Sequence, residues 1–93
     1  MNGLESDDDL RAATEKVLAV KKVHERELMA KPNVVGVGVG FRQIAGKPTD
    51  TLALVVMVTQ KLPISQLNTT DQIPNVIEGI PVDIQEVGEL FAH

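Results

Sequence analysis

The chain contains no cysteine, tryptophan or tyrosine, and its only aromatic residues are Phe41 and Phe91. Without cysteine, the protein can form no disulfide, no thiolate nucleophile and no cysteine-ligated zinc or iron–sulfur centre. Because aromatic rings are so scarce, a buried core must be built from valine, leucine, isoleucine and alanine. These absences exclude several kinds of chemistry before any motif is considered.

Positive charge is also scarce, with nine Lys and Arg against thirteen Asp and Glu, giving a net charge of −4. Nucleic acids and anionic membranes bind through clusters of Lys and Arg, so we expect neither as a partner. No apolar run approaches the roughly 20 residues of a membrane span, and the N-terminus, with Glu5, Asp7, Asp8 and Asp9, does not resemble a signal peptide. We therefore expect a cytoplasmic protein.

The 93 residues are enough for one domain, and a hydrophobic content of 43% with 24% charged residues is typical of a globular protein. We expect residues 1–6 to form a disordered N-terminus. Residues 7–93 are expected to form a single α+β domain.

A long amphipathic helix is predicted over residues 7–30. Acidic residues 7–9 would favour the positive end of the helix dipole, and Pro32 disfavours helical geometry at Lys31. Its apolar stripe, at spacings of three and four, consists of Leu10, Ala13, Val17, Val20, His24 and Leu28. This stripe is expected to pack on a sheet.

Residues 34–41 predict a strand with two unlike faces, because strand side chains alternate. One face would carry the apolar side chains, Val35, Val37, Val39 and Phe41. The other face would be nearly bare because it carries three glycines, Gly36, Gly38 and Gly40. Glycine in a strand gives nothing to pack, so three at a spacing of two indicate close packing by a neighbouring element, most simply the preceding helix.

Two further strands are predicted downstream. Residues 52–58 are apolar at every position, which indicates burial on both faces and a central position. Residues 80–87 alternate apolar with polar, and Pro81 cannot donate a ladder hydrogen bond, so we expect an edge strand. This strand could pair in parallel with the second strand or antiparallel with the first. Residues 43–50 should form a long hairpin loop, and residues 64–67 one helical turn.

The predicted fold is therefore a two-layer α+β domain, in which the long N-terminal helix packs on a small three-stranded mixed or antiparallel sheet. The order of its elements is α-β-β-short α-β. One helix can cover only one face of such a sheet, so the other face should need cover from a second copy or another protein domain. The predicted interaction surface consists of Val35, Val37, Val39, Ala53, Val55 and Met57. The alternative is that residues 64–77 fold back over this face of a monomer.

No catalytic, cofactor-binding or metal-binding residue is predicted, and we expect the protein not to be an enzyme. The glycine run is not a dinucleotide fingerprint, because Phe41 stands where that motif needs glycine. A metal site needs three or four ligands, whereas only His24 and Glu27 lie one helical turn apart. The two serines, Ser6 and Ser65, have no recognisable base beside them.

From Pro32 onward the chain resembles a known family in four segments: residues 33–41, 60–63, 73–74 and 78–88. In this order they are similar to the segment that precedes the catalytic domain in bacterial trypsin-like serine peptidases related to the plant narrow-leaf protein. In that family the protease domain supplies the catalytic triad, and full-length members are implicated in oligomeric assemblies. This chain contains no Gly-Asp-Ser-Gly motif or triad, so no catalytic residue is carried over.

The resemblance implies a non-catalytic accessory module without a cofactor, acting by self-association as a homo-oligomer or by docking onto another protein domain. The alternative function is a small anionic-ligand-binding domain that uses the glycine-rich strand with Arg42 or Lys47.

Overall fold

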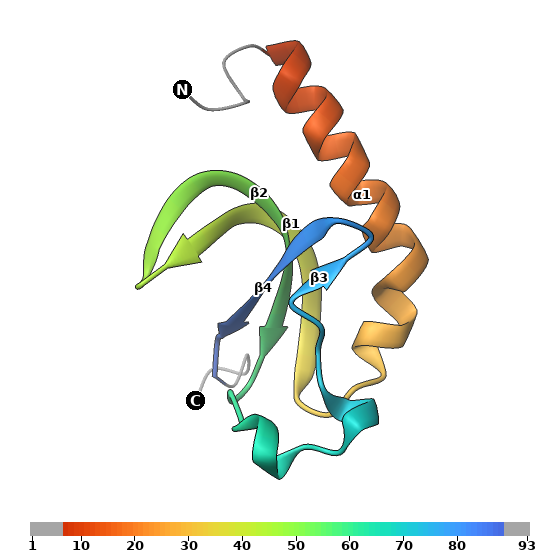
Figure 1. Ribbon diagram of the computed structural model, residues 1–93, viewed down its shortest axis with the longest axis vertical. Helices are drawn as coiled ribbons and strands as arrows, with labels where there is room; N and C mark the ends of the chain where they lie inside the picture. Colours follow the sequence, from red (N-terminus) through yellow and green to blue (C-terminus); the bar gives the residue numbers. More distant parts are fainter. Residues whose placement is uncertain (1–6, 89–93) are drawn as a thin grey trace.

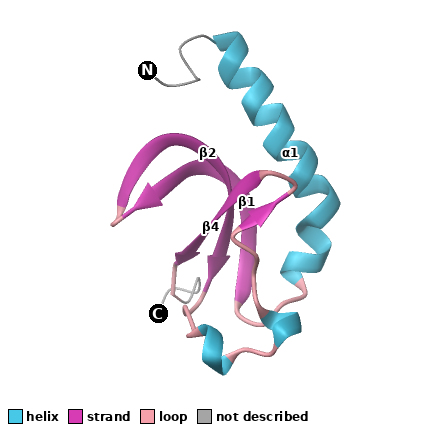
Figure 2. Cartoon of the chain, in the orientation of Figure 1, coloured by secondary structure: helices cyan, strands magenta, loops and turns pink. Residues whose placement is uncertain are grey.

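The computed structural model describes residues 7–88 and shows one long helix beside a four-stranded mixed sheet (Figures 1 and 2). Its elements are α1 (Asp7–Met29), β1 (Val34–Ile44), β2 (Lys47–Val58), two 3-10 turns (Ile64–Gln66 and Thr69–Asp71), β3 (Val76–Ile77) and β4 (Ile80–Glu86). The α+β class is confirmed. The prediction of a disordered N-terminus falls on residues 1–6, outside the described residues.

The expectation of three strands is wrong because a short hairpin precedes the last strand. Glu78 and Gly79 have positive φ angles of 50° and 80°, which is the geometry of a tight two-residue turn. This turn places β3 antiparallel beside β4, with Ile77 opposite Ile80. A strand of two residues is too short to leave a periodic signal in the sequence.

Helix α1 ends one residue before the predicted boundary, where the chain turns towards β1. Three residues of the predicted stripe, Val17, Val20 and Leu28, are buried against the sheet. Beyond the helix, Asn33 adopts a positive φ of 69°, and β1 begins at the next residue. The short link explains why the helix lies directly over the strand that follows it.

The strands lie in the order β1-β2-β4-β3, with β1 antiparallel to β2 and β4 parallel to β2. The central position of β2 is confirmed, and the parallel alternative for the last predicted strand is the observed one. The edge position predicted for that strand is wrong, because β3 lies on its outer side. Pro81 is tolerated since it precedes Val82, the first residue of β4 that pairs with β2.

The predicted loop over residues 43–50 is also wrong, because both strands continue into a two-residue turn. Ala45 and Gly46 have φ angles of 54° and 78°, and Ile44 pairs with Lys47 on either side of them. Pro48 lies opposite Gln43 in a part of β2 that β4 does not reach. Because no described strand pairs with β2 on that side of Pro48, its missing N–H costs no hydrogen bond to a neighbouring strand there.

The register of β1 breaks between Val34 and Gly36, so Val35 is an extra residue in the ladder. The bulge shifts the alternation by one residue, and Val34 lies with Val37 in the core below α1. The prediction that Val35 continues the apolar face of Val37 is therefore wrong at this position. The core cluster consists of Val17, Val20, Leu28, Val34, Val37, Leu54, Val56, Val58, Ile77, Ile80 and Val82.

Candidate interaction surfaces

The three glycines of β1 lie on the sheet face that points away from α1. In the ladder, Gly36 pairs with Met57, Gly38 with Val55 and Gly40 with Ala53. A Cβ atom at Gly36 would lie 2.7 Å from Met57 Cε, and one at Gly40 would lie 3.2 Å from Val55 Cγ2. The glycines thus face β2 side chains, and the expectation that the helix packs against them is wrong.

The β1–β2 hairpin bends away from α1 and closes over this second face (Figure 1). The backbone N–H of Gln43, near the hairpin turn, donates a 3.0 Å hydrogen bond to Asp83 Oδ2 of β4. Asp83 of β4 is the register partner of Val55 of β2. The end of the hairpin therefore reaches across β2 and contacts β4. Ala53 and Val55 are consequently only 0% and 7% exposed in a single chain.

The expectation that the second face lacks cover is therefore wrong for Ala53 and Val55. The predicted alternative, in which residues 64–77 cover this face, is not the arrangement either. Ile77 belongs to the core on the α1 side, and Ile73 packs against the same cluster. The cover comes from the curvature of the hairpin itself. The glycines permit this curvature because they add no side chains to its concave face.

The six residues of the predicted interaction surface do not form one surface. Val37 and Val39 lie with the α1-side cluster, whereas Ala53, Val55 and Met57 face the other way. Val35 occupies the bulge and is partly buried. Their contact with a partner remains a prediction, but most of their apolar area is already used within the chain.

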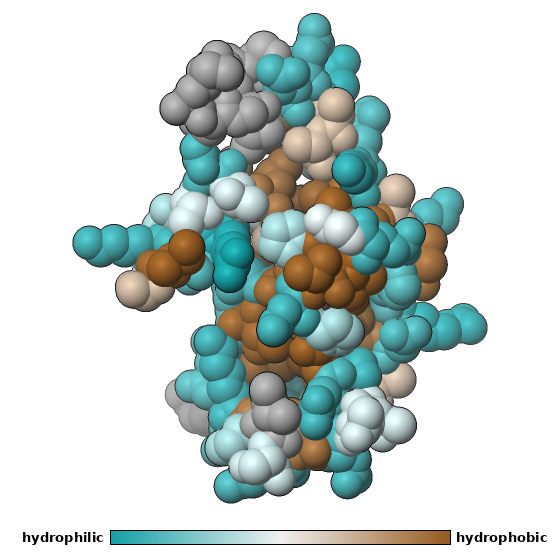
Figure 3. Space-filling model, viewed as in Figure 1, coloured by the Kyte–Doolittle hydropathy of each residue, from teal (hydrophilic) through white to brown (hydrophobic). Residues whose placement is uncertain are grey.

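Exposed apolar side chains are distributed over separate elements. Ile44 at the hairpin end is 58% exposed, Val76 of β3 is 58% exposed and Val23 of α1 is 70% exposed. On the side of the molecule drawn in Figure 3, hydrophilic residues separate the central apolar area from the apolar side chains at the left extremity. Isolated exposed side chains of this kind are common and do not by themselves mark a contact surface.

The outer edge of β1 is a different kind of surface, because its backbone is open. Between the two register breaks, residues 36–41 pair continuously with residues 52–57 of β2. In an antiparallel ladder, alternate residues direct their N–H and C=O groups away from the partner. Among residues 7–88, this stretch forms no hydrogen bond beyond its ladder with β2.

Between its two register breaks, this edge also lacks the usual features that prevent strand addition. Residues 36–41 contain no proline and no charged side chain, and the first charge comes at Arg42. Long uncharged edges are prone to pair with another strand, whereas bulges, prolines and lysines protect against it. The opposite edge, β3, has only two residues. The bulged register at each end limits the open stretch of β1 to six residues.

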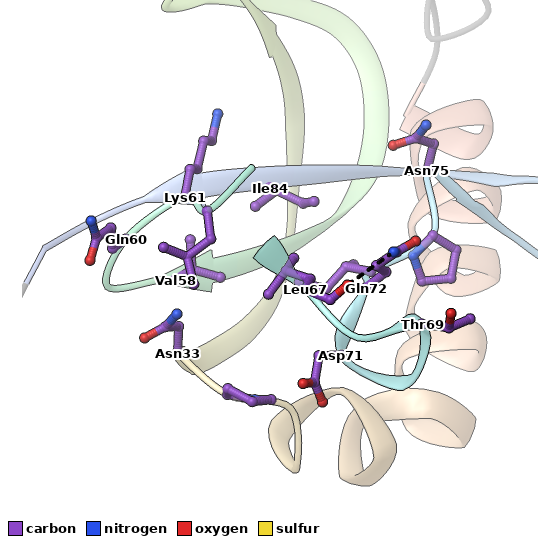
Figure 4. Close-up of a pocket in the computed structure, with 14 residues that line it drawn as sticks. Asn33, Val58, Gln60, Lys61, Leu67, Thr69, Asp71, Gln72, Asn75 and Ile84 are labelled. Carbon is purple, nitrogen blue, oxygen red and sulfur yellow. Dashed lines mark hydrogen bonds between the residues drawn. The ribbon is translucent and has the colours of Figure 1, made fainter. Parts of the chain in front are cut away.

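A pocket of about 470 Å³ lies at the other end of the sheet, between the segment of residues 60–75 and the ends of β2 and β4 (Figure 4). It is bordered by Asn33 and by the carboxyl-terminal parts of β2 and β4. Its apolar lining includes Val58, Leu67, Ile73 and Ile84. Its carboxamide lining consists of Asn33, Gln60, Gln72 and Asn75. No sequence pattern predicted this pocket, because residues 60–75 have no periodic repeat.

Hydrogen bonds hold the walls of this pocket in place. The Thr59 N–H donates to the Asn33 carbonyl over 2.9 Å, and the Lys61 N–H donates to Glu86 Oε1 over 2.8 Å. The Lys31 ammonium donates to the Thr70 carbonyl over 2.6 Å, which ties the segment to the end of the helix. The pocket is therefore largely formed before any ligand binds.

The predicted candidates for chemistry do not converge. Residues 7–88 contain no group of three or more His, Cys, Asp or Glu side chains that could hold a metal ion. His24 Nε2 lies 2.7 Å from Glu78 Oε2, so its partner is the β3–β4 turn and not Glu27. Ser65 is exposed in the first 3-10 turn, and Ser6 lies outside the described residues.

The residues of the predicted anion site are exposed on the hairpin. Arg42 and Lys47 flank a tight turn instead of the expected loop. The nearby Gln43 N–H is already bonded by the Asp83 carboxylate. Anion binding remains a prediction, and the hairpin offers no observation in its favour.

A membrane-spanning helix is also absent from the described part of the chain. Within residues 7–88, no helix combines the length and the apolar character that a span requires.

Comparison with known proteins places the chain in a family. A search of curated proteins finds no match. The family model described as the NARROW LEAF 1 N-terminal domain matches residues 11–86. This range includes most of α1, the whole sheet and the pocket segment. Since the match spans far more than half of the chain, the protein belongs to the NARROW LEAF 1 N-terminal domain family.

Proposed function

We propose that this chain is a non-catalytic, cytoplasmic interaction module that associates with a second copy of itself through the outer edge of β1. Its membership of an N-terminal domain family supports an accessory role beside another domain. The similarity to segments that precede trypsin-like peptidases suggests a protease as that neighbour. The module would then contribute assembly and no catalytic group.

The open backbone of residues 36–41 carries this proposal. Two copies can add their β1 strands antiparallel about a two-fold axis through Gly38, which makes the contact the same for both copies. Val37 of one copy then lies opposite Val39 of the other, and Gly36 lies opposite Gly40. Since the stretch is uncharged, no like charges meet across it. The two sheets would form one continuous sheet.

Single-cysteine cross-linking tests this arrangement, because the natural chain has no cysteine to interfere. In Gly38→Cys the thiols of two copies would lie directly opposite each other, within reach of a disulfide. The position accepts a side chain, since its Cβ would come no nearer than 3.9 Å to Met57 Cε. A matched control is Val76→Cys on the short opposite edge.

We expect oxidation to link Gly38→Cys into a dimer and to leave Val76→Cys largely monomeric. Light scattering of the unmodified chain at high concentration should give twice the chain mass of 10.1 kDa. A monomer mass at every concentration would contradict self-association. A dimer in which Gly38→Cys does not cross-link would contradict pairing through β1.

A further inference from the structure

We propose that the pocket between residues 60–75 and the ends of β2 and β4 binds an uncharged peptide segment through a branched aliphatic side chain, such as leucine. This site is separate from the edge of β1, and it would be present in a monomer as well as in a dimer. Three features of its lining carry the proposal: an apolar floor, a rim of carboxamides with free donors and acceptors, and balanced charge.

The floor of the pocket suits an aliphatic side chain. Val58 and Ile84 come from the adjacent strands β2 and β4, and Leu67 points towards them from the opposite wall (Figure 4). Ile73 adds a further branched side chain to this lining. Among the described residues, no aromatic side chain lines the pocket, so a flat ring would find no stacking partner among them. Burial of a branched aliphatic group is the favourable contact that this floor offers.

The rim of the pocket suits a peptide backbone. Gln60 and Asn75 form no side-chain hydrogen bond among the described residues, so each has a free donor and a free acceptor. Gln72 uses its amide nitrogen on the Leu67 carbonyl, which leaves its oxygen available. A peptide group also has one donor and one acceptor, so these carboxamides can bond both sides of a bound backbone.

The charges of the lining favour a neutral ligand. Among the described residues that line the pocket, Lys61 and Asp71 are the two charged ones, and they carry opposite signs. Phosphate and carboxylate groups are usually bound by several Lys or Arg side chains or by converging backbone N–H groups. The Lys61 N–H is already bonded to Glu86. An uncharged amide therefore matches this rim better than an anion does.

The test is an NMR titration of the full chain with N-acetyl-leucine N-methylamide, a leucine with peptide groups on both sides. We expect saturable shifts at Val58, Leu67 and Ile84. N-acetylglycine N-methylamide, which lacks the side chain, should give much smaller shifts at the same residues. Inorganic phosphate should give no saturable shift there.

Two isosteric changes test the rim. Gln60→Glu with Asn75→Asp removes both free amide donors while preserving shape, and it should weaken binding of the leucine probe by about three- to tenfold. Gln66→Glu is the matched control, since this exposed neighbour does not line the pocket, and it should change binding little. Heteronuclear spectra of each variant establish that it remains folded.

The proposal would be overturned by equal shifts from the leucine and glycine probes, or by leucine-probe shifts located on the exposed apolar residues of α1 and the hairpin. Saturable binding of phosphate in place of the amide probe would also overturn it. Light scattering in the same samples tests the edge proposal separately. Occupancy of the pocket should not change the mass of the protein, so either proposal can fail without the other.

Discussion

The two faces of the sheet are covered in different ways. The face below α1 is covered by a separate element, and the helix side chains Val17, Val20 and Leu28 fill it. The opposite face is covered by the sheet's own hairpin, which bends until Gln43 reaches Asp83. The first arrangement needs large side chains, whereas the second needs glycine where an added Cβ would be crowded, at Gly36 and Gly40. An apolar strand with one covering helix therefore does not by itself imply a partner on its second face.

The largest effect is expected where a single side chain fills the α1 side. Leu28 is fully buried, so Leu28→Ala should lower the free energy of unfolding by about 2–5 kcal/mol through lost burial and a residual cavity. Urea denaturation followed by circular dichroism measures this change. Val23→Ala, at a position 70% exposed on the same helix, is the control and should change stability by less than about 0.5 kcal/mol. Equal effects at both positions would contradict the packing described for α1.

The second face should respond to added volume instead of removed volume. Gly40→Val places atoms beyond a Cβ that already lies 3.2 Å from Val55 Cγ2, so it should cost about 1–3 kcal/mol of stability. Gly38→Ala is the control, since its Cβ would meet the nearest atom at an ordinary 3.9 Å, and it should cost less. Val55→Ala should partly rescue Gly40→Val in a double-mutant cycle. Independent, additive effects would show that these residues do not limit each other's size.

The bend of the hairpin can be released at a single side chain. Asp83→Ala removes the carboxylate that accepts from the Gln43 N–H and from the Gln85 side-chain amide, and it should lower stability by about 0.5–1.5 kcal/mol. Exchange of the Gln43 amide with solvent deuterium should become faster, while amides in the middle of α1 should keep their protection relative to global unfolding. Asp50→Ala, an exposed change on the same hairpin, is the matched control. Unchanged exchange at Gln43 would argue that the bend does not depend on Asp83.

The contact between the helix and the β3–β4 turn should have the smallest effect. His24 Nε2 and Glu78 Oε2 lie 2.7 Å apart, but the Glu78 side chain is 57% exposed. Exposed pairs contribute little, so His24→Gln should change stability by less than about 1 kcal/mol. Thermal unfolding compares it with Glu78→Gln and with the double variant. A loss much larger than this would mean that the contact organises the turn and is not a minor addition to it.

The sequence predicted the elements with strong repeating patterns. The spacing of Val17, Val20 and Leu28 identified α1, and the uninterrupted apolar residues 52–58 identified the central strand. The features it missed depend on how strands pair. The bulge at Val35 and the bend towards Asp83 exist only in relation to a neighbouring strand, so no local pattern encodes them.

The two tight turns were missed for a local reason. Ala45-Gly46 and Glu78-Gly79 both adopt positive φ at a non-glycine residue, whereas the strongest hairpin signals begin with Asn, Asp or Gly. A glycine at the second turn position, with strand-like residues on both sides, was the signal available in each case. The pocket could not be predicted, because it arises from the packing of an irregular segment against the ends of β2 and β4.

Hydrogen–deuterium exchange at residues 36–41, measured at low and at high protein concentration, tests the role of the β1 edge most directly. If two copies pair through this edge, the amides that point away from β2 will exchange more slowly at high concentration, while those bonded to β2 will change little. Exchange that is independent of concentration throughout residues 36–41 would contradict association through β1.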